Sequence, residues 1–249
     1  MLDRQSDIRR APINLADSAI VGRCGDCEAR HIGLCDAMPD QDLHFLANVA
    51  KRHKLVKGQC FVIQGDPARH FFNINHGSAK LYKDMPDGRR QIVGFVGSGD
   101  FVGLAAAQTY AFSAEAMEDI GLCRFDRSEL RAVFGLFPAI ERRLLDVASH
   151  ELVVAQEQML LLGRKNAIER VASFLDVWRH RTAACTAGEG ALDLPMSRTD
   201  LSDYLGLTVE TVSRALTALR KQGVIAIGAD HRVAILQSER LTDIAQAAA

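Results

Sequence analysis

The chain changes its periodicity at Pro138, and this change restricts the folds that it can adopt. Short apolar runs between about residues 55 and 125 alternate with glycines spaced 11 or 12 residues apart: Gly65, Gly77, Gly88 and Gly99. Strands and turns at this spacing are typical of an antiparallel sandwich or barrel, and Asp87-Gly88 predicts one of its hairpins. After Pro138 the apolar residues follow a helical repeat. The sequence therefore predicts an α+β protein with an N-terminal antiparallel β-barrel and helices after it.

Residues 138–163 are expected to form one long helix, because no Pro or Gly lies between Pro138 and Gly163. Pro138 suits a first helical turn, and Gly163 suits a C-terminal cap. Six residues form one heptad seam: Leu145, Ala148, Leu152, Ala155, Met159 and Leu162. A second apolar set would face the barrel: Leu144, Val147, Val154 and Leu161. We therefore expect this helix to pack on its own barrel and also to pair with a second copy, giving a homodimer.

Residues 196–236 contain the strongest local motif of the chain. Ser197 or Thr199 is suited to cap a short helix, and Gly206 to form the tight turn after it. Thr208 is suited to cap a second helix, and two alternating apolar runs then predict a hairpin around residues 228–230. These signals occur in the order of a C-terminal winged helix-turn-helix, so double-stranded DNA is the expected partner.

The second helix of this motif has an apolar stripe and a polar face. The stripe consists of Val212, Leu216 and Leu219. Near the helix N-terminus, the residues expected to bind DNA are Val209, Glu210, Ser213 and Arg214. This end of a recognition helix enters the major groove, where Arg donates two hydrogen bonds to guanine and Glu accepts one from a base amino group.

Composition and missing motifs narrow the class of protein. Hydrophobic residues make up 48% and charged residues 24% of the chain, as in ordinary globular proteins. No apolar run approaches the ~20 residues of a membrane span, and residues 1–20 lack the apolar core of a signal peptide. We therefore expect a cytoplasmic protein without a membrane partner. The chain shows no nucleophile elbow, phosphate-binding loop or histidine-pair metalloprotease motif, so we do not expect an enzyme.

Three of the six cysteines fall close together near the N-terminus: Cys24, Cys27 and Cys35. In a cytosolic chain of this length, such clustering indicates metal or redox chemistry more often than disulfides. With Cys123, four thiolates are available, which suits a 4Fe-4S cluster or a zinc ion. The residues alone leave both open, and Cys123 is equally compatible with a buried strand position. Cys60 and Cys185 are not assigned as ligands.

The order of glycine-punctuated barrel, long helix and winged helix-turn-helix resembles the CRP/FNR family of bacterial regulators over roughly residues 20–240. The segment LGLTVETVSRAL is similar to that family's recognition helix, and Glu210, Ser213 and Arg214 match the FNR branch residue by residue. The segment LLLGRKNAIERVASFL resembles the family's helix junction. The cysteine trio, with seven residues before Cys35, resembles the oxygen-sensing FnrN- and FnrL-like anaerobic regulators.

The resemblance implies three regions: a cysteine loop and cyclic-nucleotide-binding-like jelly roll (1–137), a dimerisation helix (138–163) and a DNA-binding domain (164–249). It implies a 4Fe-4S cluster that assembles at low oxygen, favours the dimer and is held by Cys24, Cys27, Cys35 and Cys123. It also implies a palindromic TTGAT-type promoter site and action through RNA polymerase on anaerobic or microaerobic genes. The groups expected near the sulfurs, which tune oxygen sensitivity, are Glu28, His31 and Leu34.

Three ligands other than an iron–sulfur cluster could act on such a regulator: a cyclic nucleotide, a haem and a zinc ion. A cyclic nucleotide is not expected, because Ala or Leu replaces the family's ribose-binding glutamate within residues 99–116, and Phe112, not arginine, precedes Ser113. A buried phosphate would then lack its cationic partner. A haem is not expected, because no histidine lies in a diagnostic motif. A zinc-structural site, or another redox or effector input without an iron–sulfur cluster, remains the alternative.

Overall fold

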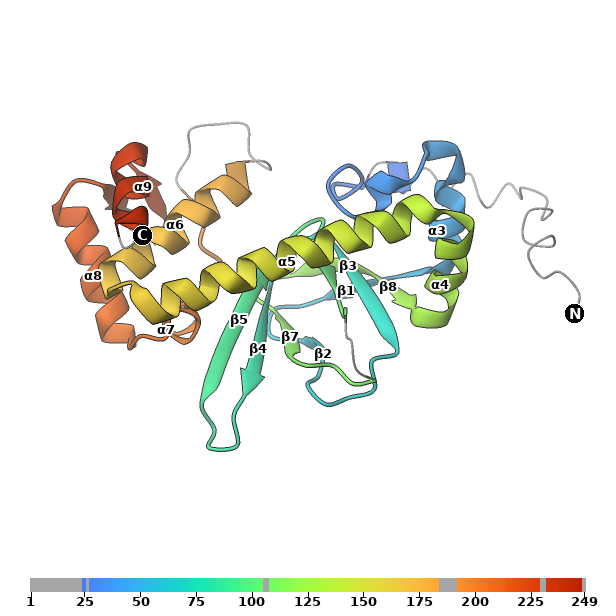
Figure 1. Ribbon diagram of the computed structural model, residues 1–249, viewed down its shortest axis with the longest axis horizontal. Coiled ribbons are helices and arrows are strands. Elements are labelled where there is room, and N and C mark those ends of the chain that lie inside the picture. The colour runs from blue at the N-terminus through green and yellow to red at the C-terminus, as the bar shows by residue number, and fades with distance from the viewer. Residues whose placement is uncertain (1–23, 26, 105–107, 184–191, 229–231, 248–249) are drawn as a thin grey trace, which may run out of the picture.

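The computed structural model describes residues 24–25, 27–104, 108–183, 192–228 and 232–247. A β-rich half, one long helix and a helical C-terminal unit follow one another along the chain, and the long helix connects the other two (Figure 1). The predicted fold class is confirmed: an N-terminal jelly roll, a long helix and a C-terminal helix-turn-helix. None of the described helices combines the length and the apolar composition that crossing a membrane requires.

The jelly roll consists of two four-stranded antiparallel sheets, ordered β1-β8-β3-β6 and β2-β7-β4-β5. Their strands are β1 (Ala50–Leu55), β2 (Cys60–Val62), β3 (His70–His76), β4 (Ala79–Asp84), β5 (Arg90–Val96), β6 (Phe101–Val102), β7 (Ser113–Ala116) and β8 (Ile120–Asp126). The Asp87-Gly88 turn joins β4 to β5 as predicted, and Gly88 has a φ of 84°. Side chains alternate across β8, so Ile120 and Leu122 join the core between the sheets.

The other face of β8 is covered by helices. Cys123 and Phe125 lie on this outer face, in a cluster with residues of four helices. These helices are η1 (Leu34–Ala37), α3 (Leu43–Val49), α4 (Arg127–Leu136) and the beginning of α5, with η2 (Asp40–Asp42) directly before α3. The apolar residues of 40–50 follow a helical spacing, and this segment forms η2 and α3. The sequence did not predict α4.

The long helix α5 spans Pro138–Arg164, and Pro138 occupies its first turn. The prediction that Gly163 caps this helix is wrong, because the helix continues through Gly163 and its C-cap is Lys165. The reason lies in the next helix, where the Arg170 guanidinium donates hydrogen bonds to Leu162 O (2.8 Å) and Lys165 O (2.9 Å). These bonds satisfy carbonyls that the helix end leaves without intrahelical partners.

The C-terminal unit is the predicted helix-turn-helix. Its elements are α6 (Ala167–Ala183), α7 (Arg198–Leu205), α8 (Val209–Lys221), β9 (Ile225–Ile227), β10 (Val233–Ile235) and α9 (Ser238–Gln246). Ser197 rather than Thr199 caps α7, in a capping box with Asp200, and Gly206 ends α7 with a φ of 61°. Thr208 caps α8. β9 pairs with β10, whereas the tip of the predicted hairpin, at 229–231, lies outside the described residues.

Candidate functional site

Cys123 and the cysteine loop meet on the outer face of the jelly roll. The Cys123 side chain is 8% exposed and lies in the outer cluster with Leu34 of η1. Cys24 and Cys35 pack against the same cluster, and Cys27 is half-buried. The fold thus brings the predicted fourth ligand to the side of β8 where the loop lies, rather than into the barrel core.

The loop is fixed to the barrel by close contacts. A methyl group on Gly33 would lie 2.9 Å from Gly99 O and 3.1 Å from Asn73 Oδ1, so only glycine fits there. The buried Arg30 donates hydrogen bonds to Cys35 O (2.5 Å), Met38 O (2.7 Å) and Asp40 Oδ1 (2.7 Å). The sequence did not single out Arg30, because an arginine between cysteines resembles an ordinary surface charge. No local signal in the sequence reveals that it is buried.

The thiols influence one another electrostatically. Burial, followed by the nearby thiols of Cys123, Cys24 and Cys27, raises the pKa of Cys35 to about 12. Burial also raises the pKa of Cys123. Deprotonating these thiols together therefore requires a compensating cation, and metal ions supply one, because they deprotonate the thiols that bind them.

The described residues nevertheless contain no three potential ligand side chains that already form a metal-binding group. The four cysteines suit a metal ion or cluster bound by thiolates, because they supply the right donor atoms, lie on one face of the barrel and influence one another's charge. Binding would bring the four sulfurs closer together. The predicted ligand set stays a prediction.

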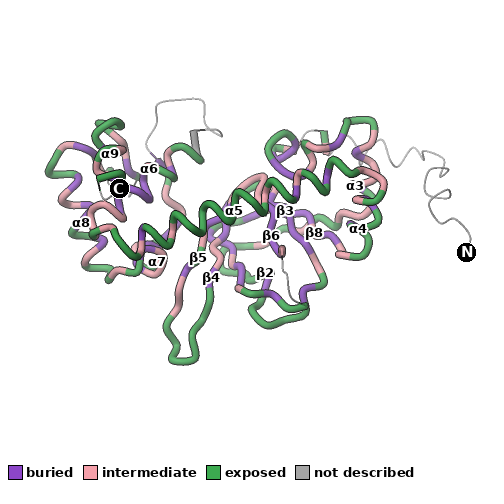
Figure 2. Tube along the Cα trace, in the orientation of Figure 1, coloured by how far each residue is buried: buried purple, intermediate pink, exposed green. Residues whose placement is uncertain are grey.

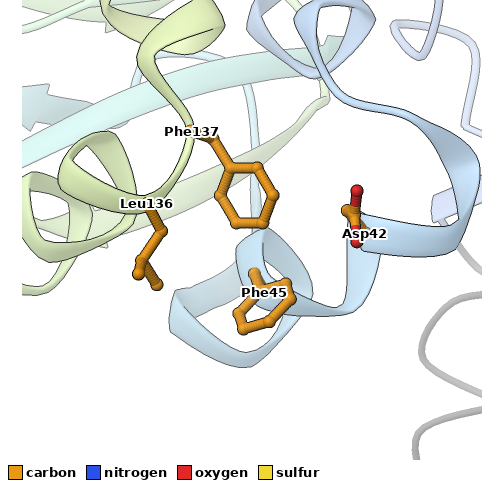
Figure 3. Close-up of a pocket in the computed structure, with 4 residues that line it drawn as sticks. All are labelled: Asp42, Phe45, Leu136 and Phe137. Atoms are coloured by element: carbon orange, nitrogen blue, oxygen red, sulfur yellow. The ribbon is translucent and has the colours of Figure 1, made fainter. Parts of the chain in front are cut away.

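A hollow of about 340 Å³ lies where α3 and α4 approach the beginning of α5 (Figure 3). Its lining consists of Asp42, Phe45, Leu136 and Phe137, and the two phenylalanine rings are 5.0 Å apart. None of the predicted site residues lines it. Three apolar side chains and one carboxylate do not resemble a thiolate site, and we assign the hollow no function.

The recognition helix α8 presents the expected polar face. Val212, Ala215, Leu216 and Leu219 are buried, whereas all four residues predicted to bind DNA are exposed: Val209, Glu210, Ser213 and Arg214. Arg214 Nη2 donates to Glu210 Oε1 at 2.6 Å, and both side chains are exposed, so separating this ion pair costs little. The guanidinium is therefore oriented along the helix surface and remains available to a base. Contact of these residues with bases stays a prediction.

The heptad seam of α5 is largely uncovered (Figure 2). Leu145, Leu152 and Met159 are 66%, 61% and 67% exposed. Ala148 and Ala155 are exposed as well, whereas Leu162 is half-buried against the C-terminal unit. Their role as dimer interface stays a prediction.

The expectation that the second apolar set of α5 faces the barrel holds only near the beginning of the helix. Leu144 packs in the outer cluster, but Val154 is exposed and Leu161 belongs to the C-terminal core. The physical reason is the length of α5, which runs past the barrel to the C-terminal unit (Figure 1).

The C-terminal helix-turn-helix unit also touches the barrel directly. Lys80 Nζ of β4 lies 2.8 Å from Asp200 Oδ1 of α7 and 3.2 Å from Glu115 Oε1. Gln91 of β5 donates to the Asp203 carbonyl at 2.6 Å. Asp200 is the residue that completes the α7 capping box, so one carboxylate both caps the first helix of the motif and binds the barrel.

Two family models match the two halves of the chain: "Cyclic nucleotide-binding domain" over residues 52–135 and "Crp-like helix-turn-helix domain" over residues 169–244. The nitrogen fixation regulation protein FixK of Bradyrhizobium diazoefficiens is 40% identical over 208 residues, which cover 82% of this chain and 86% of FixK. The chain belongs to the CRP/FNR family of transcription regulators. It is therefore a regulator rather than an enzyme, and its family membership implies DNA binding and dimerisation.

Other members of the CRP/FNR family show the same relationship along most of the chain. The transcriptional activator protein FnrL of Cereibacter sphaeroides is 38% identical over 228 residues, covering 90% of this chain and 92% of FnrL. The solved structure of FixK2 from Bradyrhizobium japonicum is 37% identical with a TM-score of 0.73 and covers 81% of this chain and 100% of that chain. The arrangement of barrel, long helix and helix-turn-helix is therefore the family's arrangement.

Proposed function

We propose that this CRP/FNR protein is an oxygen-responsive transcription regulator that holds a 4Fe-4S cluster with Cys24, Cys27, Cys35 and Cys123. The observation that carries the proposal is the position of Cys123, which lies on the outer face of β8, in the cluster against which Cys24 and Cys35 pack. When bound, such a cluster supplies an oxygen-labile iron centre whose presence signals low oxygen. Similarity to FnrL supports this input.

The loop is coupled to the dimer helix by direct contacts. Arg143 of α5 donates to Ile32 O at 3.3 Å, and Leu34 shares the outer cluster with Ile140 and Leu144 of α5. Ligation of Cys35 would hold η1 against this part of α5. A bound group shifts the dimer equilibrium only if it binds the dimer more tightly. A hundredfold shift requires about 2.7 kcal/mol of differential binding.

The dimer would place two recognition helices on a palindromic site with TTGAT-type half-sites. Arg214 is positioned to donate to guanine O6 and N7, and Glu210 to accept from a base amino group, once their mutual ion pair separates. FnrL and FnrA of Stutzerimonas stutzeri are described as transcriptional activators. These names support a role as an activator, and the proposal extends it to action through RNA polymerase on genes used at low oxygen.

A cyclic nucleotide has no part in this proposal, although the barrel has the corresponding fold. The buried Ser113 Oγ already accepts a hydrogen bond from Gln64 N at 3.0 Å. Phe112 packs against the apolar core between the sheets. Residues 105–107, within the stretch where the ribose-binding glutamate is missing, lie outside the described residues.

The decisive experiment is the visible spectrum, with iron and sulfide analysis, of protein purified without oxygen and then exposed to air. About four iron and four sulfide per chain, lost in air together with affinity for the palindrome, is the expected result. Cys35→Ser should prevent cluster assembly, and the exposed Cys60→Ser is the matched control. A colourless protein that holds zinc and binds the palindrome equally well in air would contradict the iron–sulfur proposal and favour a zinc-structural site.

A further inference from the structure

Among the described residues, two barrel side chains donate hydrogen bonds to the sulfurs of Cys24 and Cys123. Arg52 Nη2 lies 3.7 Å from Cys24 Sγ, and Asn75 Nδ2 lies 3.5 Å from Cys123 Sγ. The polar loop residues expected near the sulfurs are instead turned to solvent: the Glu28 and His31 side chains are 74% and 76% exposed. The polar surroundings of the thiols therefore come in part from β1 and β3.

Strand register explains why these two residues reach the thiols. β8 lies between β1 and β3, and Arg52 is paired directly opposite Cys123. Directly opposed residues share a face of the sheet, so Arg52 projects toward the loop. On the other side, the register shifts between Ile74 and His76 and leaves Asn75 as an extra residue. Such a bulge reorients a side chain, here toward Cys123.

The chemistry of both donors suits thiolates. A cluster or metal ion held by four thiolates leaves negative charge on the sulfurs, and hydrogen bonds or positive charge beside them stabilise that state. The Arg52 guanidinium donates to Cys24 Sγ, and Arg52 is paired directly opposite Cys123 across the β1–β8 ladder. One guanidinium thus lies beside two of the four predicted ligands.

Asn75 makes a more directed contact. Its Oδ1 is buried without a hydrogen-bond partner among the described residues. Among the described residues, the hydrogen bond from Asn75 Nδ2 to Cys123 Sγ is thus what orients this side-chain amide. An N–H group directed at the sulfur stabilises the thiolate more than the thiol, because the thiolate is the stronger hydrogen-bond acceptor.

We propose that Arg52 and Asn75 are positioning residues for the group bound by the four cysteines. Arg52 compensates the charge of Cys24 and Cys123, and Asn75 directs a hydrogen bond to Cys123. The identity of the group as a 4Fe-4S cluster rests on the proposed function, whereas the role of the two donors toward the thiolates does not. Arg52 belongs to β1 and Asn75 to β3, so the barrel rather than the cysteine loop holds both donors.

The test uses the full-length reduced protein without oxygen, and Co²⁺ as the probe. Sulfur-to-cobalt charge-transfer absorption reports thiolate binding, and iron and sulfide content after reconstitution reports the cluster. Arg52→Gln should weaken Co²⁺ binding by about tenfold, and Asn75→Leu by roughly threefold to tenfold. Removing a residue that hydrogen-bonds to a metal ligand typically has effects of about tenfold or more, so these are modest changes. Arg52→Lys should restore most of the affinity. Lys54→Gln is the control, because Lys54 is exposed and follows Arg52 by two positions on the same strand face.

The outcomes separate this proposal from the preceding one. If the unmodified protein binds Co²⁺ but never iron and sulfide, the iron–sulfur function fails while the cobalt series still decides the role of Arg52 and Asn75. Suppose that the unmodified protein holds the cluster, and that Arg52→Gln and Asn75→Leu match Lys54→Gln in Co²⁺ affinity and in iron and sulfide content. The positioning role is then overturned, and the iron–sulfur function stands. Arg52→Lys as weak as Arg52→Gln would overturn charge compensation. An unmodified protein that binds neither probe would overturn both proposals.

Discussion

Helices α5 and α8 each carry an apolar stripe, and of these two helices only α8 buries it. In α8, Val212, Leu216 and Leu219 are buried inside the DNA-binding unit, whereas Leu152 and Met159, in the second half of α5, face solvent. Burying one such side chain stabilises a protein by about 1.5–3 kcal/mol. A single chain does not gain this stabilisation from the α5 stripe, because the stripe stays exposed to solvent. The α8 stripe completes a domain, and we infer that the α5 stripe completes an assembly of two chains.

The largest expected effect concerns the buried stripe. Leu216→Ala should lower the free energy of unfolding of the DNA-binding unit by about 2–5 kcal/mol, because it opens a cavity in a closed core. Trp178, the single tryptophan of the chain, lies in this core, so its fluorescence during urea unfolding measures the loss. Leu152→Ala is the matched control on the exposed stripe. If both substitutions shifted the tryptophan transition equally, the distinction between the two stripes would be lost.

The next effect concerns the exposed stripe. Leu152→Glu should raise the dimer dissociation constant by about a hundredfold, equivalent to about 2.7 kcal/mol, because two carboxylates would face each other across a symmetric seam. Analytical ultracentrifugation without oxygen measures this constant. Val177→Glu on α6, also at an exposed apolar residue, should leave it unchanged. A dimer unaffected by Leu152→Glu would show that α5 does not form the interface.

The outward face of α8 gives a smaller effect. Arg214→Ala should weaken binding by about 1–3 kcal/mol per half-site and relax the preference for guanine at one position. Arg220→Ala, at the far end of the same helix, should instead weaken all sequences similarly and reduce the salt dependence. Competition binding with single-base variants of the half-site distinguishes the two. An unchanged base preference in Arg214→Ala would contradict the assigned reading face.

The smallest effect concerns the contact between α7 and the barrel. Burial raises the pKa of Asp200, but hydrogen bonds from Lys80 and Ser197 outweigh it and hold the pKa below its usual range. A depressed carboxyl pKa contributes stability above the unfolded-state pKa of about 3.9 and loses it as pH falls through the folded value. Lys80→Met should therefore cost about 1 kcal/mol at pH 7. In urea unfolding this cost should shrink below about pH 4, and a cost that stays constant with pH would exclude the ion pair as its source.

The helix-turn-helix was predictable because its signals act on their own neighbours. Ser197, Gly206 and Thr208 each fix a helix end through groups no more than four residues away. The contacts of Arg52 and Asn75 with the sulfurs depend instead on strand register and a bulge, which no short segment encodes. The prediction that Gly163 caps α5 was wrong for a similar reason, because a side chain of the next helix, Arg170 of α6, binds the carbonyls at the end of α5. The cysteines could be recognised by type and spacing, but their surroundings could not.

The length of α5 has a mechanical consequence. Its 27 residues form an uninterrupted rod of about 40 Å that touches the cysteine loop near one end and the DNA-binding unit at the other. A tilt of about 3° at the loop end would displace the far end by about 2 Å, given this length. Hydrogen bonds to base edges tolerate roughly 0.5 Å of variation, so such a tilt suffices to make or break them. In a symmetric dimer the C-terminal ends of the two α5 helices would move in opposite directions. The tilt would thus change the distance between the two recognition helices α8.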